Sequence, residues 1–511
     1  MSSIKKLAGQ TIWYGVSSIA ARFLFYVITP YLTSKLSVAG YGDMSILYAA
    51  IPFLNVIFTY GIETAYFRFA SKDEYKKDIY STATISILCS TFLLTLILLL
   101  SKSSLAHLLR LDNYPEFITY SALIIACDTL ATLPLAKLRL SQRPRKYAMI
   151  MISKIILQII IIYFFLSVCP KLSAAKPDGF IATFYKPAYG VGYIIIANLC
   201  AAFFALILLH KELFAFEFKF NKKVWSTMIV YSLPLLIAGF GGMINETFDR
   251  IMLSWLAPVT NIDAAKDQVA IYSACYKLSI LITLFIQAFR MGAEPFFFKQ
   301  AEGQNPQKVY ARVMKFFVIT ITIMFLVVAM YLDIWKYFLS TNAEKLKIYW
   351  TGLKVVPILL LANMFLGIYY NLSIWYKLTH KTIAGAYITL IGAAITLVIN
   401  YIFIPHFGYM ACAWATFLCY GSMMVISFIW GQKDYRIPYA WRKLCAYMVI
   451  VVLLFFIHEV IIHFFTGSII NFLSATFLLL LYLWFIMNVE RSELQRMPIL
   501  KKFLPISEKR N

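Results

Sequence analysis

The segment Tyr41–Ala70, YGDMSILYAAIPFLNVIFTYGIETAYFRFA, returns in diverged form at Tyr272–Ala301, YSACYKLSILITLFIQAFRMGAEPFFFKQA. The two segments align without a gap at a shift of 231 residues. The segments before them align at a shift of 228. Identical pairs include Tyr41/Tyr272, Leu47/Leu278, Phe58/Phe289, Gly61/Gly292, Glu63/Glu294, Arg22/Arg250 and Pro30/Pro258. Chance similarity between apolar segments does not readily supply all of these pairs, so the pattern indicates an internal repeat.

The composition is that of a polytopic helical membrane protein. Of 511 residues, 61% are hydrophobic and 14% charged, and the mean hydropathy is +0.74. The net charge of +23 would suggest nucleic acid in a soluble protein, but here it indicates a basic surface facing anionic membrane lipids, with no nucleic-acid partner. The N-terminal MSSIKKLAGQ resembles a signal sequence, yet the apolar run continues without a cleavage motif, so we expect a retained first span. The eight cysteines form no CxxC, and we expect no metal site.

Hydropathy predicts fourteen membrane spans, each of about 20 residues. Their centres lie near residues 22, 55, 90, 128, 157, 199, 243, 283, 322, 361, 392, 419, 453 and 478. With the N-terminus inside, the inside segments hold 31 Lys and Arg, against 10 in the outside loops. This bias predicts that both termini are cytoplasmic.

The predicted spans and the internal repeat together predict an all-α fold. It consists of two six-helix lobes related by a pseudo-two-fold axis along the membrane normal, plus two C-terminal helices. The expected units are an N-terminal lobe (1–210), an inter-lobe linker (211–225), a C-terminal lobe (226–432), helices 13 and 14 (433–490) and a basic tail (491–511). No loop is long enough to hold a separate catalytic domain, so we expect no catalytic residues and no enzyme.

Charged residues within the spans are the candidate site. The span Tyr231–Pro258, YSLPLLIAGFGGMINETFDRIMLSWLAP, carries Glu246, Asp249 and Arg250, and such groups by default face a bundle interior or a water-filled cavity. Arg22 lies near the centre of the first span with no acid one turn away. Because guanidinium binds phosphate oxygens in a bidentate manner, Arg22 and its repeat-mate Arg250 predict a site for an anionic ligand.

The eighth span adds Lys277, expected about two turns from its outer end, and Arg290, on its inner half. A purely structural interpretation competes at several of these positions. Arg290 with Glu294, and Arg250 with Glu246, are i,i+4 pairs that can simply hold the bundle together, and for Arg290 this interpretation is favoured. Asp128 is predicted to stand alone in the fourth span, and Lys154 is expected to snorkel to an interface.

The fourteen spans, the two lobes, the first helix WYGVSSIAARFLFYVITPYLTSKLSVAGYG (13–42) and the stretch GIETAYFRFASKDE (61–74) resemble the polysaccharide-biosynthesis flippases of the multidrug/oligosaccharidyl-lipid/polysaccharide (MOP) exporter superfamily. The resemblance implies a bacterial inner-membrane protein that moves an undecaprenyl-diphosphate-linked oligosaccharide to the periplasmic leaflet by alternating access. It also implies association with a polysaccharide polymerase and glycosyltransferases, in O-antigen, capsule or exopolysaccharide synthesis. In that setting Arg22, Arg250, Lys277 and Arg290 are the expected substrate-binding residues.

Three alternatives stay open. They are a lipid II flippase, a drug or cation antiporter of the MATE type, and a membrane-embedded polysaccharide polymerase or ligase. The drug exporters use membrane carboxylates, notably an Asp in helix 1 of many members, whereas helix 1 here has Arg22 and no acid. No cofactor is expected. Asp128, Glu246 and Asp249 are the candidates for coupling transport to H⁺ or Na⁺, and the membrane potential is a further energy source for transport.

Overall fold

The computed structural model describes residues 20, 23–24, 26–70, 78–301, 303–465 and 467–494. Within them, thirteen helices are long and apolar enough to cross a membrane, which makes this a multi-pass membrane protein. These helices correspond to the second to fourteenth predicted spans. The first predicted span lies largely outside the described residues.

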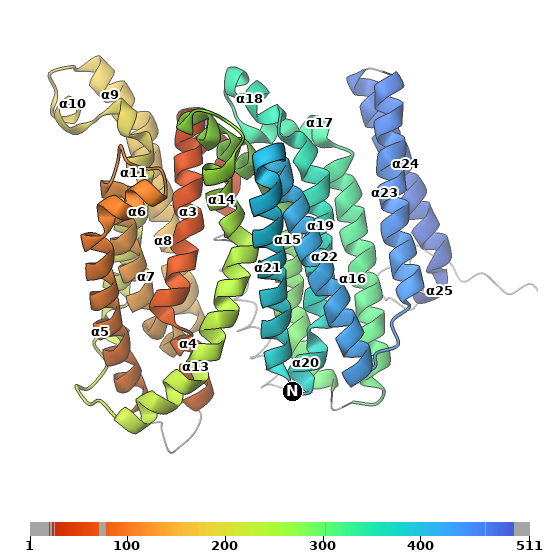
Figure 1. The fold of residues 1–511 in the computed structure, drawn as a ribbon, viewed down its shortest axis with the longest axis horizontal. Helices are drawn as coiled ribbons and strands as arrows, with labels where there is room; N and C mark the ends of the chain where they lie inside the picture. Colours follow the sequence, from red (N-terminus) through yellow and green to blue (C-terminus); the bar gives the residue numbers. More distant parts are fainter. Residues whose placement is uncertain are drawn as a thin grey trace, which may run out of the picture.

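The N-terminal lobe contains five described spans. They are α3 (Val38–Thr59), α5 (Ile79–Leu100), α7 (Glu116–Leu140), α8 (Pro144–Tyr163, continued by a π-turn into α9, Cys169–Ala175) and α11 (Gly190–Leu208). Short helices join or flank them, namely α2 (Thr29–Lys35), α4 (Ile62–Phe69), α6 (Lys102–Leu108), α10 (Phe180–Phe184) and α12 (His210–Leu213). Figure 1 shows this lobe in red to yellow beside the C-terminal lobe.

The C-terminal lobe contains six spans. They are α13 (Lys222–Met243, continued by a π-turn at Ile244–Phe248 into α14, Asp249–Leu256), α15 (Ile262–Gln300), α16 (Pro306–Ala329), α19 (Val356–Leu372, followed by α20, Ile374–Leu378), α21 (Thr382–Phe407) and α22 (Tyr409–Asp434). Short helices α17 (Leu332–Trp335) and α18 (Ala343–Trp350) connect two of them. The last pair, α23 (Trp441–Phe464) and α24 (Ser468–Val489), packs outside the lobe against α16, and α25 (Arg491–Leu494) follows.

The two copies of the repeat differ at their aligned glycines. In the first copy the helix breaks at Tyr60 and Gly61, whose φ angles are 36° and 74°, before α4 resumes. In the second copy α15 runs unbroken through Gly292. At Gly61 an added Cβ would lie 3.2 Å from the Ser232 carbonyl oxygen of α13, so the break brings α4 close to the first helix of the other lobe. Accordingly α13 packs on α3, α4 and α5 as well as on α21, and it bridges the two lobes.

Candidate functional site

A cavity of about 1340 Å³ lies beside α13, α15, α19, α20 and α21. Among the described residues, all of its lining comes from the C-terminal lobe except Tyr26 and Ile155. It extends to Thr382 and Ile383, exposed residues that begin α21 next to the basic segment 375–383. We call that side of the bundle, where the Lys- and Arg-rich segments lie, the basic end. The described part of the site is therefore strongly asymmetric between the lobes.

Three cations line this cavity within the described chain, namely Lys277, Arg290 and Lys377. Arg290 Nε donates to Glu294 Oε1 at 2.8 Å, as the i,i+4 spacing predicts. Lys377 Nζ contacts the same oxygen at 2.6 Å, so one carboxylate joins α15 to α20. From the sequence, Lys377 is only one of the basic loop residues, because nothing local to its segment shows that it faces Glu294.

Lys277 lies 15 residues, or about four turns and roughly 22 Å, from the start of α15 at Ile262. The helix therefore extends well beyond the apolar stretch from which Lys277 is expected about two turns inside the span. Lys277 and its neighbour Tyr276 both line the cavity.

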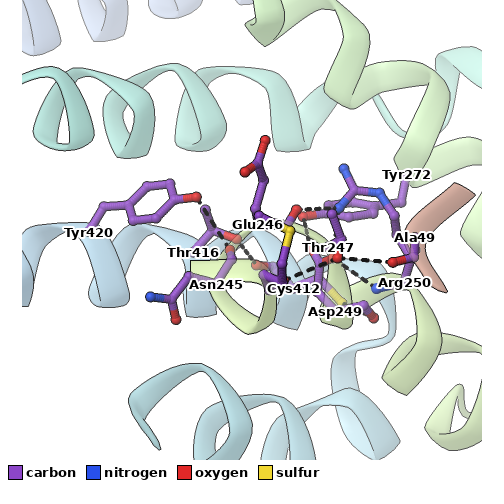
Figure 2. Close-up of polar contacts among 11 residues, drawn as sticks. Ala49, Asn245, Glu246, Thr247, Asp249, Arg250, Tyr272, Cys412, Thr416 and Tyr420 are labelled. Atoms are coloured by element: carbon purple, nitrogen blue, oxygen red, sulfur yellow. Dashed lines mark hydrogen bonds and ion pairs between the residues drawn. The ribbon is translucent and has the colours of Figure 1, made fainter. Parts of the chain in front are cut away.

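Arg250 does not line the cavity; it is held in a buried polar cluster (Figure 2). Its Nη1 lies 2.8 Å from Asp249 Oδ1 and 2.8 Å from the carbonyl oxygen of Glu246, and its guanidinium stacks on Tyr276 at 4.4 Å. Tyr272 donates its hydroxyl to Asp249 Oδ2 at 2.6 Å. Asp249 is only 3% exposed, and each of its two carboxylate oxygens accepts a hydrogen bond from a protein partner.

The π-turn explains why Arg250 pairs with Asp249. Ile244–Phe248 forms i→i+5 hydrogen bonds, which add a residue to the turn and rotate Glu246 relative to Arg250. Arg250 therefore meets the Glu246 backbone carbonyl, whereas the Glu246 side chain is exposed and lines the cavity. In Figure 2 the Glu246 carboxylate extends away from the Asp249 cluster.

Asp128 is not alone, and that prediction was wrong. Its carboxylate contacts Lys154 Nζ at 2.5 Å, between α7 and α8 of the N-terminal lobe, and neither residue lines the cavity. Lys154 therefore does not simply snorkel. The two helices form an antiparallel hairpin, and both residues lie 13 positions from Ser141 at its turn, a spacing from which the pair could have been found. Arg22, the remaining predicted site residue, lies outside the described residues.

Besides the contacts of α13, the lobes touch at the end opposite the basic end, along what we call the inter-lobe seam. Asp43 of α3 pairs with Lys266 of α15 at 2.9 Å, with side-chain exposures of 12% and 8%. A Cβ on Gly42 would lie 2.2 Å from the Lys266 carbonyl oxygen, so the backbones are in direct contact. Hydrogen bonds from Lys345 to the Ser34 and Leu36 carbonyl oxygens, at 2.8 and 2.6 Å, continue the seam.

A family model described as "Polysaccharide biosynthesis protein" matches residues 7–301, and a model described as "MatE" matches residues 257–402. A search of curated proteins found no match. Similar solved structures include an inward-facing multidrug resistance MATE family transporter of the MOP superfamily, with a TM-score of 0.59 at 13% identity, covering 86% of this chain and 95% of that chain. A mutant of the Vibrio cholerae MATE transporter VcmN gives a TM-score of 0.54 at 13% identity, with coverage of 84% and 97%. These structures establish likeness of fold.

Proposed function

This chain belongs to the polysaccharide biosynthesis protein family, within the MOP superfamily, and from that premise we propose that it is a flippase for an undecaprenyl-diphosphate-linked oligosaccharide. It moves this molecule between the leaflets of the bacterial inner membrane, with both termini cytoplasmic, and supplies the synthesis of a surface polysaccharide. The molecule crosses without chemical conversion, so the protein is not an enzyme.

The observation that carries this proposal is a large cavity that is lined by cations and lies among helices long enough to span a membrane. A diphosphate that leaves the headgroup region needs fixed positive charge, since moving an isolated ion into a low-dielectric interior costs several kcal/mol, on the order of 5. Lys277 lines the cavity and supplies that charge, whereas Arg290, which also lines it, is paired with Glu294. Arg250, whose charge is balanced by Asp249, packs behind Tyr276, and the repeat assigns the role of a further cation to Arg22.

Alternating access is supported by a difference between the two ends of the molecule. The lobes meet at the inter-lobe seam, while the cavity reaches Ile383 at the basic end. Because Lys and Arg concentrate in cytoplasmic loops, this arrangement is a state loaded from the cytoplasm. Opening the seam and closing the basic end deliver the headgroup to the other side.

For the coupling ion, Glu246 is the best of the three candidate carboxylates. Asp128 is paired with Lys154, and Asp249 with Arg250 and Tyr272, whereas Glu246 faces the cavity. We propose that Glu246 takes up H⁺ or Na⁺ once the diphosphate has left, and that the membrane potential acts on the net positive cavity.

A MATE-type export of organic cations is the second candidate, favoured by the MatE match over residues 257–402 and by the similar structures. The two functions require opposite charge preferences in the same cavity. Lys277, Arg290 and Lys377 outnumber Glu246 and Glu294 in the described lining, which favours an anionic substrate.

The test uses the full chain in proteoliposomes with two probes, a polyprenyl diphosphate carrying a fluorescent N-acetylhexosamine and the cationic dye ethidium. Chemical quenching from outside reports the flipped lipid. We expect flipping of the lipid probe, a loss of at least about tenfold in Lys277→Ala and Arg22→Ala, and a partial loss in Arg250→Ala. Lys433→Ala, in the last turn of α22 and outside the cavity, is the control. Ethidium transport without lipid flipping would overturn the proposal, and wild-type rates in Lys277→Ala and Arg22→Ala would remove the cationic site.

A further inference from the structure

We propose that a distinct subsite in the cavity, on its side toward the basic end, binds the saccharide part of the transported molecule. It consists of Arg290, Glu294, Tyr369, Tyr370, Tyr376 and Lys377, and we call this set the saccharide corner. The inference rests on the proposed function, since it assigns the parts of a lipid-linked oligosaccharide to different places in one cavity.

Distance separates the saccharide corner from Lys277. Lys277 and Arg290 lie on the same unbroken helix, 13 residues and therefore about 20 Å apart along its axis. A single diphosphate is much shorter than this, so it does not engage both cations at once. The cavity, at about 1340 Å³, also exceeds the roughly 300–1,000 Å³ of a pocket for a drug-sized ligand, which leaves room for several sugar rings.

The charged groups of the saccharide corner carry both signs. Glu294 accepts from both Arg290 and Lys377, at 2.8 and 2.6 Å, so a carboxylate stands between the two cations. That carboxylate repels a phosphate. A sugar hydroxyl both donates and accepts hydrogen bonds, and here it finds N–H donors and carboxylate acceptors side by side. The group therefore suits an uncharged polyol better than a second anion.

Three tyrosines, Tyr369, Tyr370 and Tyr376, form an aromatic wall of the saccharide corner. The guanidinium of Arg290 stacks on Tyr370 at 4.7 Å, and the hydroxyls of Tyr369 and Tyr376 lie 3.4 Å apart. Tyr370 and Tyr376 are half-buried and line the cavity. Tyrosine rings present an apolar face together with a polar hydroxyl, which matches the C–H faces and hydroxyls of a sugar ring. A diphosphate has no apolar face for such a wall.

The experiment measures binding of two probes to the purified full chain in lipid nanodiscs. The probes are inorganic pyrophosphate and a panel of uncharged oligosaccharides of three to five sugars. Glu294→Gln and Tyr376→Leu are expected to weaken oligosaccharide binding at least about tenfold while leaving pyrophosphate affinity nearly unchanged. Lys277→Ala is expected to do the reverse. Tyr387→Leu is the control, since Tyr387 is 58% exposed and does not line the cavity.

Thermal unfolding of each variant, together with the conservative Tyr376→Phe, separates local effects from misfolding. Tyr376→Phe keeps the ring, and we expect it to retain most of the oligosaccharide affinity. The saccharide corner is overturned if no oligosaccharide binds the wild type, or if Glu294→Gln and Tyr376→Leu bind oligosaccharide with normal affinity. It is also overturned if these two variants lose as much affinity for pyrophosphate as for oligosaccharide. Failure of the wild type to bind pyrophosphate would instead contradict the proposed function, whatever the oligosaccharide result.

Discussion

Asp43 Oδ1 lies 2.9 Å from Lys266 Nζ, and this buried ion pair joins the two lobes at the end opposite the cavity mouth. The pair couples α3 to α15, the two helices that the internal repeat relates. Opening the seam requires that both charges be separated and hydrated. The pair therefore favours the state in which the lobes meet at this end.

Asp43→Asn should shift the molecule toward a state with the seam open. Removing one partner of a buried pair costs about 3–5 kcal/mol, and that cost falls only on the state that keeps Lys266 buried. Spin labels at Ser103 and Lys347, which are exposed on opposite lobes, would report a longer distance by pulsed electron paramagnetic resonance. Asp333→Asn, which breaks the exposed pair with Lys336 within one lobe, should leave the distance unchanged.

Gly42→Ala should open the same seam for a steric reason. Its Cβ would lie 2.2 Å from the Lys266 carbonyl oxygen, a distance that the two backbones must relieve by separating. The distance between the same two spin labels should therefore increase. Gly421→Ala is the matched helix-glycine control, because its nearest atom, in the Phe365 side chain, is 3.4 Å away. An unchanged distance in Gly42→Ala would show that the α3–α15 contact is adaptable.

The aligned glycines should respond oppositely to alanine. Gly61 has a φ of 74°, which costs an L-residue roughly 1–2 kcal/mol, so Gly61→Ala should lower the thermal midpoint in detergent. Gly292 lies inside continuous α15 with no atom within 4 Å of an added Cβ, so Gly292→Ala should be neutral or stabilising by up to about 1 kcal/mol. Equal losses in both variants would contradict the observed break at Tyr60 and Gly61.

The Asp128–Lys154 pair should be structural. Asp128→Ala leaves Lys154 without its partner and should lower stability by about 1–3 kcal/mol in thermal unfolding. Asp128→Asn combined with Lys154→Met should recover most of that loss and keep lipid flipping. If the stable double variant fails to transport, Asp128 takes part in the cycle after all.

Glu490 should make the attachment of the C-terminal helices pH-dependent. Burial raises the pKa of Glu490, but hydrogen bonds from Lys315, Lys443 and Tyr447 outweigh it, and the pKa is lowered from 4.5. A lowered carboxylate pKa adds stability that is present above the unfolded value and is lost as the pH falls through the folded value.

At pH 7, Glu490→Gln should therefore unfold more easily than the wild type, by about 1–3 kcal/mol. The difference should shrink as the pH falls from 4.5 through the lower pKa of the folded state, where the wild-type carboxyl becomes protonated. Thermal unfolding from about pH 3 to about pH 8 measures this. Asp434→Asn, which breaks the more exposed pair with Lys381, should change stability by no more than about 1 kcal/mol at pH 7. A pH-independent difference in Glu490→Gln would assign its effect to packing.

Much of the architecture was predictable because it follows from local properties. Spans two to fourteen were confirmed, since apolar length alone identifies a membrane helix. The i,i+4 pair Arg290–Glu294 was also predictable, because both members lie on one regular helix. Prediction failed where geometry departs from that regularity. The π-turn at Ile244–Phe248 redirected Arg250 from the Glu246 side chain to Asp249, and hairpin register brought Lys154 to Asp128.

The membrane class and the parallel repeat follow from the chain read in order, because hydropathy and an ungapped internal alignment are properties of the linear sequence. Helix packing, in contrast, sets which charges face the cavity and which neutralise each other. Lys277, Lys377 and Glu246 line the cavity, whereas Arg250 and Asp249 are bound to one another. That division depends on the rotation of each helix about its axis, and the rotation is set by neighbours far away in sequence.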